Sequence, residues 1–194
     1  MRCRRVAPGL AVLAVLLAGC ATAYTEGVAA ARQGRYVEAS TRFEEALAQR
    51  PDRLDALIGL GVARYKLGAY DEAIATLDRA RERAPGDAGV RLYLGLAHLR
   101  RGDLGPADEH LTAYANAARG RRSAARAEEA LRLLRGDPAV TEAMRTFVAA
   151  SLEDEAELER EAEDARRALE RAPTRYPIST TPLCTVRSGR LYCF

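Results

Sequence analysis

The sequence predicts an all-α fold in which pairs of helices stack into a solenoid. The central part of the chain repeats itself with a period of about 34 residues, which is typical of repeat architectures. The composition is 48% hydrophobic but only 6% aromatic, with no tryptophan. A composition rich in alanine and poor in aromatic residues favours closely packed helices over β-sandwiches. A length of 194 residues allows one domain of ordinary size with an appendage.

Residues 1–19 have the features of a signal peptide that is removed on export. Three arginines precede an apolar run over 6–18, which is shorter than the roughly 20 residues of a membrane span. The run ends in Leu-Ala-Gly, followed by Cys20. This ending resembles the lipobox of bacterial lipoproteins, which implies that Cys20 receives a diacylglyceryl group and becomes the first residue after cleavage. The alternative is an ordinary signal peptide that happens to contain a cysteine.

The resemblance to a lipoprotein implies an envelope protein held by its acyl chains, such as palmitate. Each buried CH₂ contributes roughly 0.8 kcal/mol, so two or three chains hold a protein firmly on a bilayer. Ala21 and Thr22 follow the cysteine, and the absence of aspartate there favours the outer membrane, facing the periplasm, over the inner membrane. Subtracting the three leader arginines from the 30 basic residues leaves 27, equal to the 27 acidic ones. The neutral remainder gives no indication of nucleic-acid binding.

Residues 20–119 contain three copies of the repeating unit, beginning near residues 20, 54 and 88. Small and large apolar residues recur in phase: Gly27, Gly61 and Gly95; Gly34, Gly68 and Gly102; Ala39, Ala73 and Ala107; Tyr36, Tyr70 and Leu104; Phe43, Leu77 and Leu111. This pattern resembles the tetratricopeptide repeat (TPR), which implies two antiparallel helices per unit. Gly68 is expected to end a first helix in the left-handed conformation. Stability is expected from the stacking of neighbouring units.

The third unit departs from the pattern near its end. Tyr114 stands where a small residue is expected, and Arg119 replaces the terminal proline. Its second helix is therefore expected to run on or to pack differently. Residues 120–136 contain a leucine-bearing helix that ends at Gly136, and we interpret it as a cap on the array.

Residues 137–172 contain no helix breaker after Pro138, so the sequence predicts one long helix of roughly 50 Å. Its first part is expected to pack on the repeats with one apolar side, formed by Val140, Met144, Phe147, Val148 and Leu152. Its second part is highly charged, with acids before arginines, which complements the helix dipole. This part is expected to project into solvent, and a coiled-coil contact with another chain is the alternative.

Residues 173–194 read as a proline-rich linker and a β-hairpin. With a two-residue turn at 188–189, Cys184 faces Cys193 at a non-hydrogen-bonded pair, near the distance that a disulfide requires. These two thiols are expected to pair in an oxidising envelope. A metal site is the less favoured alternative, because no further ligands lie nearby. The hairpin is either a chain end held by this disulfide or a recognition loop.

The sequence contains no enzyme signature, and we predict no catalytic residue, no metal site and no cofactor. HExxH, GxSxG and phosphate-loop motifs are missing from the sequence. His98 and His110 fall on repeat helices, and His98 occupies a packing position. We therefore interpret His98 as a core or groove residue.

The TPR resemblance implies that the concave face, lined by the first helix of each unit, binds a protein or peptide. Carrying the family pattern over gives the groove residues Tyr24, Arg32, Ile58, Tyr65, Lys66, Leu92, Leu96, Leu99 and Arg100. Arg32, Lys66 and Arg100 share one phase and would form a basic ladder beside an apolar floor. Such a groove suits a peptide with some acidic residues. The alternatives are a solvated surface, or a groove filled by the protein's own 138–172 helix.

The sequence thus predicts a membrane-anchored envelope lipoprotein that acts as a TPR scaffold or adaptor. Its expected setting is the assembly of an envelope machine, in the style of secretin pilotins or adaptors for cell-wall enzymes. One alternative is a structural lipoprotein that self-associates through the long helix. Another is a binder of a small ligand or peptidoglycan fragment. The oligomeric state is not predicted.

Overall fold

A computed structural model of the chain describes residues 23–136, 140–171, 184–187 and 190–193. Two units are separated between Glu155 and Ala156. The described part of the first unit contains the stacked helices and the beginning of helix α8. The described part of the second unit contains the remainder of α8 and two strands. None of the described helices has an apolar stretch that could cross a bilayer.

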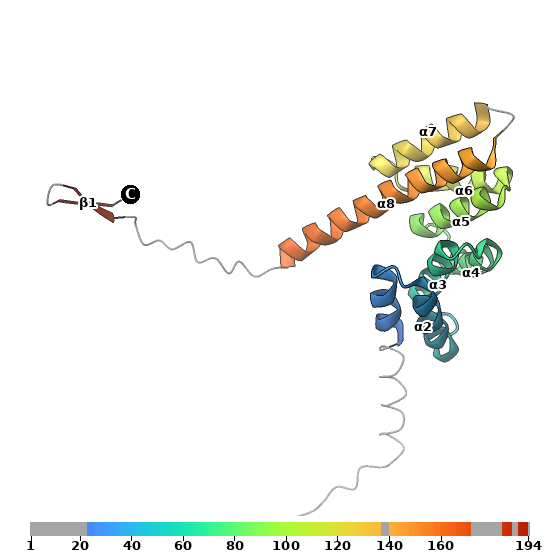
Figure 1. Ribbon diagram of the computed structural model, residues 1–194, viewed down its shortest axis with the longest axis horizontal. Helices are drawn as coiled ribbons and strands as arrows, with labels where there is room; N and C mark the ends of the chain where they lie inside the picture. The colour runs from blue at the N-terminus through green and yellow to red at the C-terminus, as the bar shows by residue number, and fades with distance from the viewer. Residues whose placement is uncertain (1–22, 137–139, 172–183, 188–189, 194) are drawn as a thin grey trace, which may run out of the picture. The chain divides into compact units, whose positions relative to one another are not determined.

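The first unit is a stack of antiparallel helix pairs (Figure 1). The first pair is a helix described over 23–32 and α2 (Tyr36–Gln49). The second pair is α3 (Leu54–Lys66) and α4 (Tyr70–Arg83), and the third is α5 (Ala88–Arg101) and α6 (Leu104–Ala117). Helix α7 (Arg122–Gly136) packs on α6, and α8 (Glu142–Arg171) follows. The predicted all-α solenoid of three pairs, a capping helix and a long last helix is confirmed.

A glycine in each first helix lets a large side chain of the second helix lie against its backbone. A Cβ added at Gly61 would lie 2.5 Å from Cγ of Leu77, so no other residue fits there without a shift. Phe43 also reaches the next pair, because a Cβ added at Gly59 would lie 2.6 Å from its ring. Phe43 and Leu77 are 2% and 0% exposed. These side chains hold each pair together, and Phe43 joins the first pair to the second.

Glycines end the first helices as predicted. Gly68 follows α3 with φ of 79°, and Gly102 follows α5 with φ of 100°. Both values lie in the left-handed region, which glycine adopts without a steric cost. Of the two alternatives expected for the third unit's second helix, running on or packing differently, the first is wrong, because α6 ends at Ala117 and Gly120 turns the chain with φ of 91°.

Helix α8 begins at Glu142, later than the residue 137 expected from the sequence. Thr141 caps it, since its Oγ1 accepts a hydrogen bond from the Met144 backbone N–H at 3.3 Å. The prediction that Phe147 faces the repeats is wrong, because its side chain is 73% exposed. Leu152 follows five residues later, about 140° around the helix, and is 1% exposed. The two residues therefore cannot share one face.

The second unit contains the charged end of α8 and a β-hairpin. Ion pairs spaced by four residues, such as Arg166–Glu170 at 3.1 Å, line this part of the helix. Strands β1 (Cys184–Arg187) and β2 (Arg190–Cys193) pair antiparallel, with Cys184 opposite Cys193. This register is the predicted one. The turn at 188–189 and the side chains of both strands lie outside the described part of the chain, so the disulfide stays a prediction.

Candidate functional site: the inner face of the repeats

The predicted groove residues lie on the first helix of each pair. We call the surface that these first helices form together the inner face. The predicted residues come from three helices: Tyr24 and Arg32 from the helix at 23–32, Ile58, Tyr65 and Lys66 from α3, and Leu92, Leu96, Leu99 and Arg100 from α5. Helix α3 packs directly against α5 as well as against α4. The structure therefore brings the predicted residues of the second and third pairs onto neighbouring helices.

The inner face is open at the first pair and near the beginning of α3. Arg32 is exposed, and Tyr24 and Ile58 are half-buried. The Tyr24 ring lies 5.9 Å from the ring of Phe43 and carries the Arg53 guanidinium 4.0 Å above its centre. Burial raises the pKa of Tyr24, so its hydroxyl is a neutral donor at physiological pH. This end of the face offers an aromatic ring, an aliphatic side chain and a cation to a binding partner.

The middle of the inner face is a buried aromatic cluster around Tyr65. Its ring lies edge-on to Tyr93 at 5.5 Å and tilted to Tyr70 at 5.9 Å between ring centres. Burial, followed by the nearby Glu153 carboxylate, raises the pKa of Tyr65. The Tyr70 hydroxyl accepts a hydrogen bond from Arg100 Nε at 2.9 Å. Tyr65 therefore serves the core, and the guanidinium of Arg100 has a partner within the repeats.

The inner face is closed at the third pair. Leu92, Leu96 and Leu99 are 3%, 0% and 0% exposed, although the family pattern places them in the groove. The beginning of α8 lies near the end of α5, where Arg145 approaches Gly102. Its side chains of Val148, Ala149 and Leu152 are 6%, 1% and 1% exposed. The segment 142–155 therefore occupies part of the face that the sequence assigned to a partner.

One ion pair and one contact between an arginine and a glycine locate this segment. Lys66 Nζ, at the end of α3, lies 2.9 Å from Glu153 Oε1, with side-chain exposures of 18% and 12%. At the end of α5, a Cβ added at Gly102 would lie 3.6 Å from Cζ of Arg145. The helical rise between Arg145 and Glu153 is about 12 Å. Residues 142–155 thus run from the end of α5 to the end of α3.

The predicted basic ladder does not act as one set. Arg32 is exposed, whereas Lys66 pairs with Glu153 and Arg100 bonds to Tyr70. Sequence reasoning missed Arg145, Ala149 and Glu153. A helical-wheel reading would have found them, because Arg145 and Ala149 share one face of the helix with Leu152, and Glu153 lies at the edge of that face.

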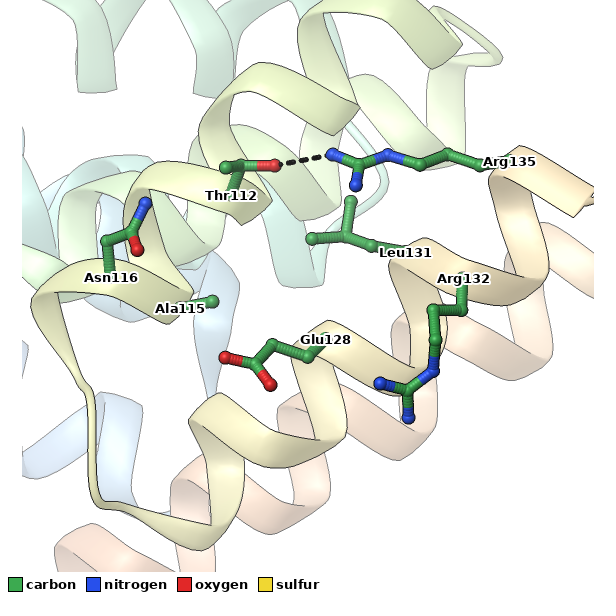
Figure 2. Close-up of a pocket in the computed structure, with 7 residues that line it drawn as sticks. All are labelled: Thr112, Ala115, Asn116, Glu128, Leu131, Arg132 and Arg135. Atoms are coloured by element: carbon green, nitrogen blue, oxygen red, sulfur yellow. Dashed lines mark hydrogen bonds between the residues drawn. The ribbon is translucent and has the colours of Figure 1, made fainter.

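A separate cleft of about 260 Å³ opens between α6 and α7. Its lining residues are Thr112, Ala115, Asn116, Glu128, Leu131, Arg132 and Arg135 (Figure 2). Arg135 is already engaged, because it donates to Thr112 Oγ1 at 2.9 Å and to both carboxylate oxygens of Asp108. Glu128, Arg132 and Asn116 are exposed, so they are the polar groups that a ligand in this cleft would meet.

The two histidines are stacked inside the third pair. Their rings lie 5.6 Å apart at an angle of 15°, and both side chains are buried. Arg91 Nη1 lies 3.2 Å from His110 Nδ1; an arginine only donates, so this nitrogen accepts. Burial lowers the pKa of His110. The pair is therefore a packed polar contact between α5 and α6, and of the two positions expected for His98, core or groove, the structure shows the core.

The predicted lipidation site and the question of a metal site are separate from the inner face. Cys20 lies outside the described residues, so its lipidation stays a prediction. Within the described part of the chain, no group of three or more histidine, cysteine, aspartate or glutamate side chains is placed to hold a metal ion.

Comparisons with known proteins agree with this architecture. Residues 30–91 match the family model described as tetratricopeptide repeat. No curated protein matches the sequence.

Several solved structures are similar. MamA (41-end) from Desulfovibrio magneticus RS-1 is 25% identical, with a TM-score of 0.57 over 70% of this chain and 76% of that chain. The type III secretion translocator chaperone SycD of Yersinia enterocolitica is 18% identical, with a TM-score of 0.55 over 61% and 95%. PcrH, in complex with the chaperone binding region of PopD, is 21% identical, with a TM-score of 0.54 over 70% and 100%. The chain therefore has the fold of a tetratricopeptide-repeat solenoid, a type of protein-interaction scaffold.

Proposed function

We propose that this chain is a lipid-anchored envelope protein whose repeats hold a protein partner on their inner face. Anchoring through Cys20 rests on the leader: three arginines, a short apolar run and a lipobox-like ending. Placement in the outer membrane, facing the periplasm, rests on the residues after Cys20. The proposed role is that of an adaptor in the assembly of an envelope machine.

The observation that supports partner binding best is the division of the inner face. Part of it, at the ends of α3 and α5, already accommodates a helix, residues 142–155, which makes an ion pair with Lys66 and has the buried side chains of Val148, Ala149 and Leu152. Another part of the face leaves Tyr24, Arg32 and Ile58 in contact with solvent. PcrH has the same fold and is described in complex with a segment of another protein. The fold is thus compatible with holding a partner segment.

The test is an envelope crosslinking pull-down with variants that place glutamate on the repeats. The test variant carries Arg32→Glu and Ile58→Glu on the open part of the inner face. The matched control carries Arg79→Glu, an exposed arginine on α4, a second helix of its pair. We expect the native protein and the control to recover a partner that the test variant loses while its circular dichroism stays native. Recovery of the same partners by all three proteins, or of none, would reject binding at this face.

A small ligand, such as a peptidoglycan fragment, is a second candidate function, supported by the cleft between α6 and α7 (Figure 2). Calorimetric titration with soluble muropeptides tests it. Binding that Arg132→Ala removes would support this candidate, and no heat of binding up to millimolar concentration would exclude muropeptides as ligands.

A further inference from the structure

We propose that residues 142–155 of α8 are an internal ligand of the inner face, which a partner's amphipathic helix must displace. The inference rests on the proposed function, since it names the regulation and the kind of partner for the same site. The partner is a helix with small to medium apolar side chains at positions i, i+1 and i+4 and a carboxylate at i+5. These are the positions of Val148, Ala149, Leu152 and Glu153 in α8.

The carboxylate is the most specific part of this motif. Glu153 lies 2.9 Å from Lys66, the sole lysine of the chain, and little of either side chain reaches solvent. An ion pair that is shielded from solvent is screened less by salt than an exposed pair. If the lysine lost its partner, a charge would remain in a largely buried place, which is costly. The face therefore requires an acid at this point, from α8 or from the helix that replaces it.

The apolar part of the motif is small, which makes displacement feasible. Between residues 142 and 155, the buried apolar side chains are those of Val148, Ala149 and Leu152. By comparison, α4 within the array buries Ala73, Ile74, Thr76, Leu77 and Ala80. The opposite side of the segment is solvent-exposed, with Phe147 73% exposed. The segment is thus held by one narrow stripe.

The site for the incoming helix extends beyond the segment that it replaces. Tyr24 and Arg32 lie on the open part of the inner face, in the first helix pair, whereas the closed part lies at α5 and at the end of α3. A partner helix that also reaches Arg32 with a second acid would gain contacts that α8 does not make in the described structure. This difference would allow a partner to compete with an intramolecular contact.

The experiment uses the mature full-length chain in detergent and a fluorescent peptide of residues 140–158 as the probe. Leu152→Asp places a carboxylate in the buried stripe and releases α8, and Glu153→Lys releases it by charge repulsion from Lys66. Phe147→Asp on the exposed side of the same segment is the matched control. We expect the peptide to bind both released variants at least tenfold more tightly than it binds the native chain or the control. Circular dichroism verifies that each variant keeps its helices.

Charge exchange tests the recognition of the acid. In the Leu152→Asp chain, Lys66→Glu should abolish peptide binding, and a peptide carrying Glu153→Lys should restore it. Equal binding to the native and both released chains, or no effect of Lys66→Glu, would overturn the proposal. A native chain that is dimeric, and that the peptide converts to monomers, would also overturn it, because the occupant would then be a second copy. These readouts need no envelope partner, so they can succeed when the pull-down fails, and the reverse.

Discussion

Replacement of Leu152 by alanine measures how firmly the beginning of α8 is held on the repeats. Leu152 is 1% exposed, and the change removes three carbon atoms from the buried stripe. At about 0.8 kcal/mol per methylene the transfer free energy alone is about 2.4 kcal/mol. Measured leucine-to-alanine losses in protein cores run from about 2 to 5 kcal/mol. We expect about 2–3 kcal/mol, because a helix at the edge of an array can settle into the vacated space.

The assay is amide hydrogen exchange across residues 142–155. A loss of about 2–3 kcal/mol in the free energy of local opening corresponds to exchange that is roughly 30- to 150-fold faster. Alanine is the best helix former, so faster exchange would not reflect weaker helix propensity. Phe147→Ala, on the exposed side, should change exchange less than about threefold. Similar exchange rates in the Leu152→Ala and Phe147→Ala variants would refute the assignment of Leu152 to the side of α8 that packs on the repeats.

Three further predictions concern the repeats. Phe43→Ala should lower the free energy of unfolding in urea by about 3–5 kcal/mol, because the ring joins two helix pairs; the exposed Val37→Ala on the same helix should cost less than about 0.5 kcal/mol. Gly68→Ala should cost about 1–2 kcal/mol in thermal denaturation because its φ is 79°, whereas Gly86→Ala, with no atom near the added Cβ, should not destabilise. Because burial lowers the pKa of His110, protons bind preferentially to the unfolded chain, so stability should fall as pH drops from about 6.5 towards that lowered pKa. His110→Gln should flatten this dependence, measured as the free energy of unfolding against pH. The same dependence in the variant and the native chain would contradict the prediction.

The helix pairs could be predicted from the sequence because each contact within a pair is local and repeats. Gly61 and Leu77 recur in the next unit as Gly95 and Leu111, so one packing solution accounts for several units. The left-handed conformation at Gly68 follows from the same repetition. Such signals depend on residue type and spacing, which a single sequence displays in full.

The occupied state of the inner face could not be predicted in the same way. The family pattern describes a groove made by repeats alone, and it assigns Leu92, Leu96 and Leu99 to its surface. Those leucines are buried, and Arg145 and Glu153 of α8 lie at the ends of α5 and α3, although α6 and α7 separate α8 from α5 along the chain. No repeat relates α8 to α5, so the position of α8 follows from tertiary packing rather than from a pattern.

The sequence contains enough information to orient α8, but the prediction is wrong at Phe147. Large aromatic side chains are usually buried, and this preference suggests a face that contains Phe147 and Leu152 together. Helical geometry separates them by about 140°, and the structure buries Leu152 with Ala149. Placing Glu153 at the edge of that stripe would have suggested a partner for the single lysine.

The most direct test of the central claim, that the beginning of α8 covers part of the inner face, is a zero-length carbodiimide crosslink in the native chain. Lys66 is the sole lysine, so few amines can react, and its Nζ lies 2.9 Å from Glu153. Mass spectrometry of the digested monomer should show an amide bond between Lys66 and Glu153, and Leu152→Asp should reduce its yield severalfold. A monomer in which Lys66 links to other acids, or a yield that Leu152→Asp leaves unchanged, would contradict the account.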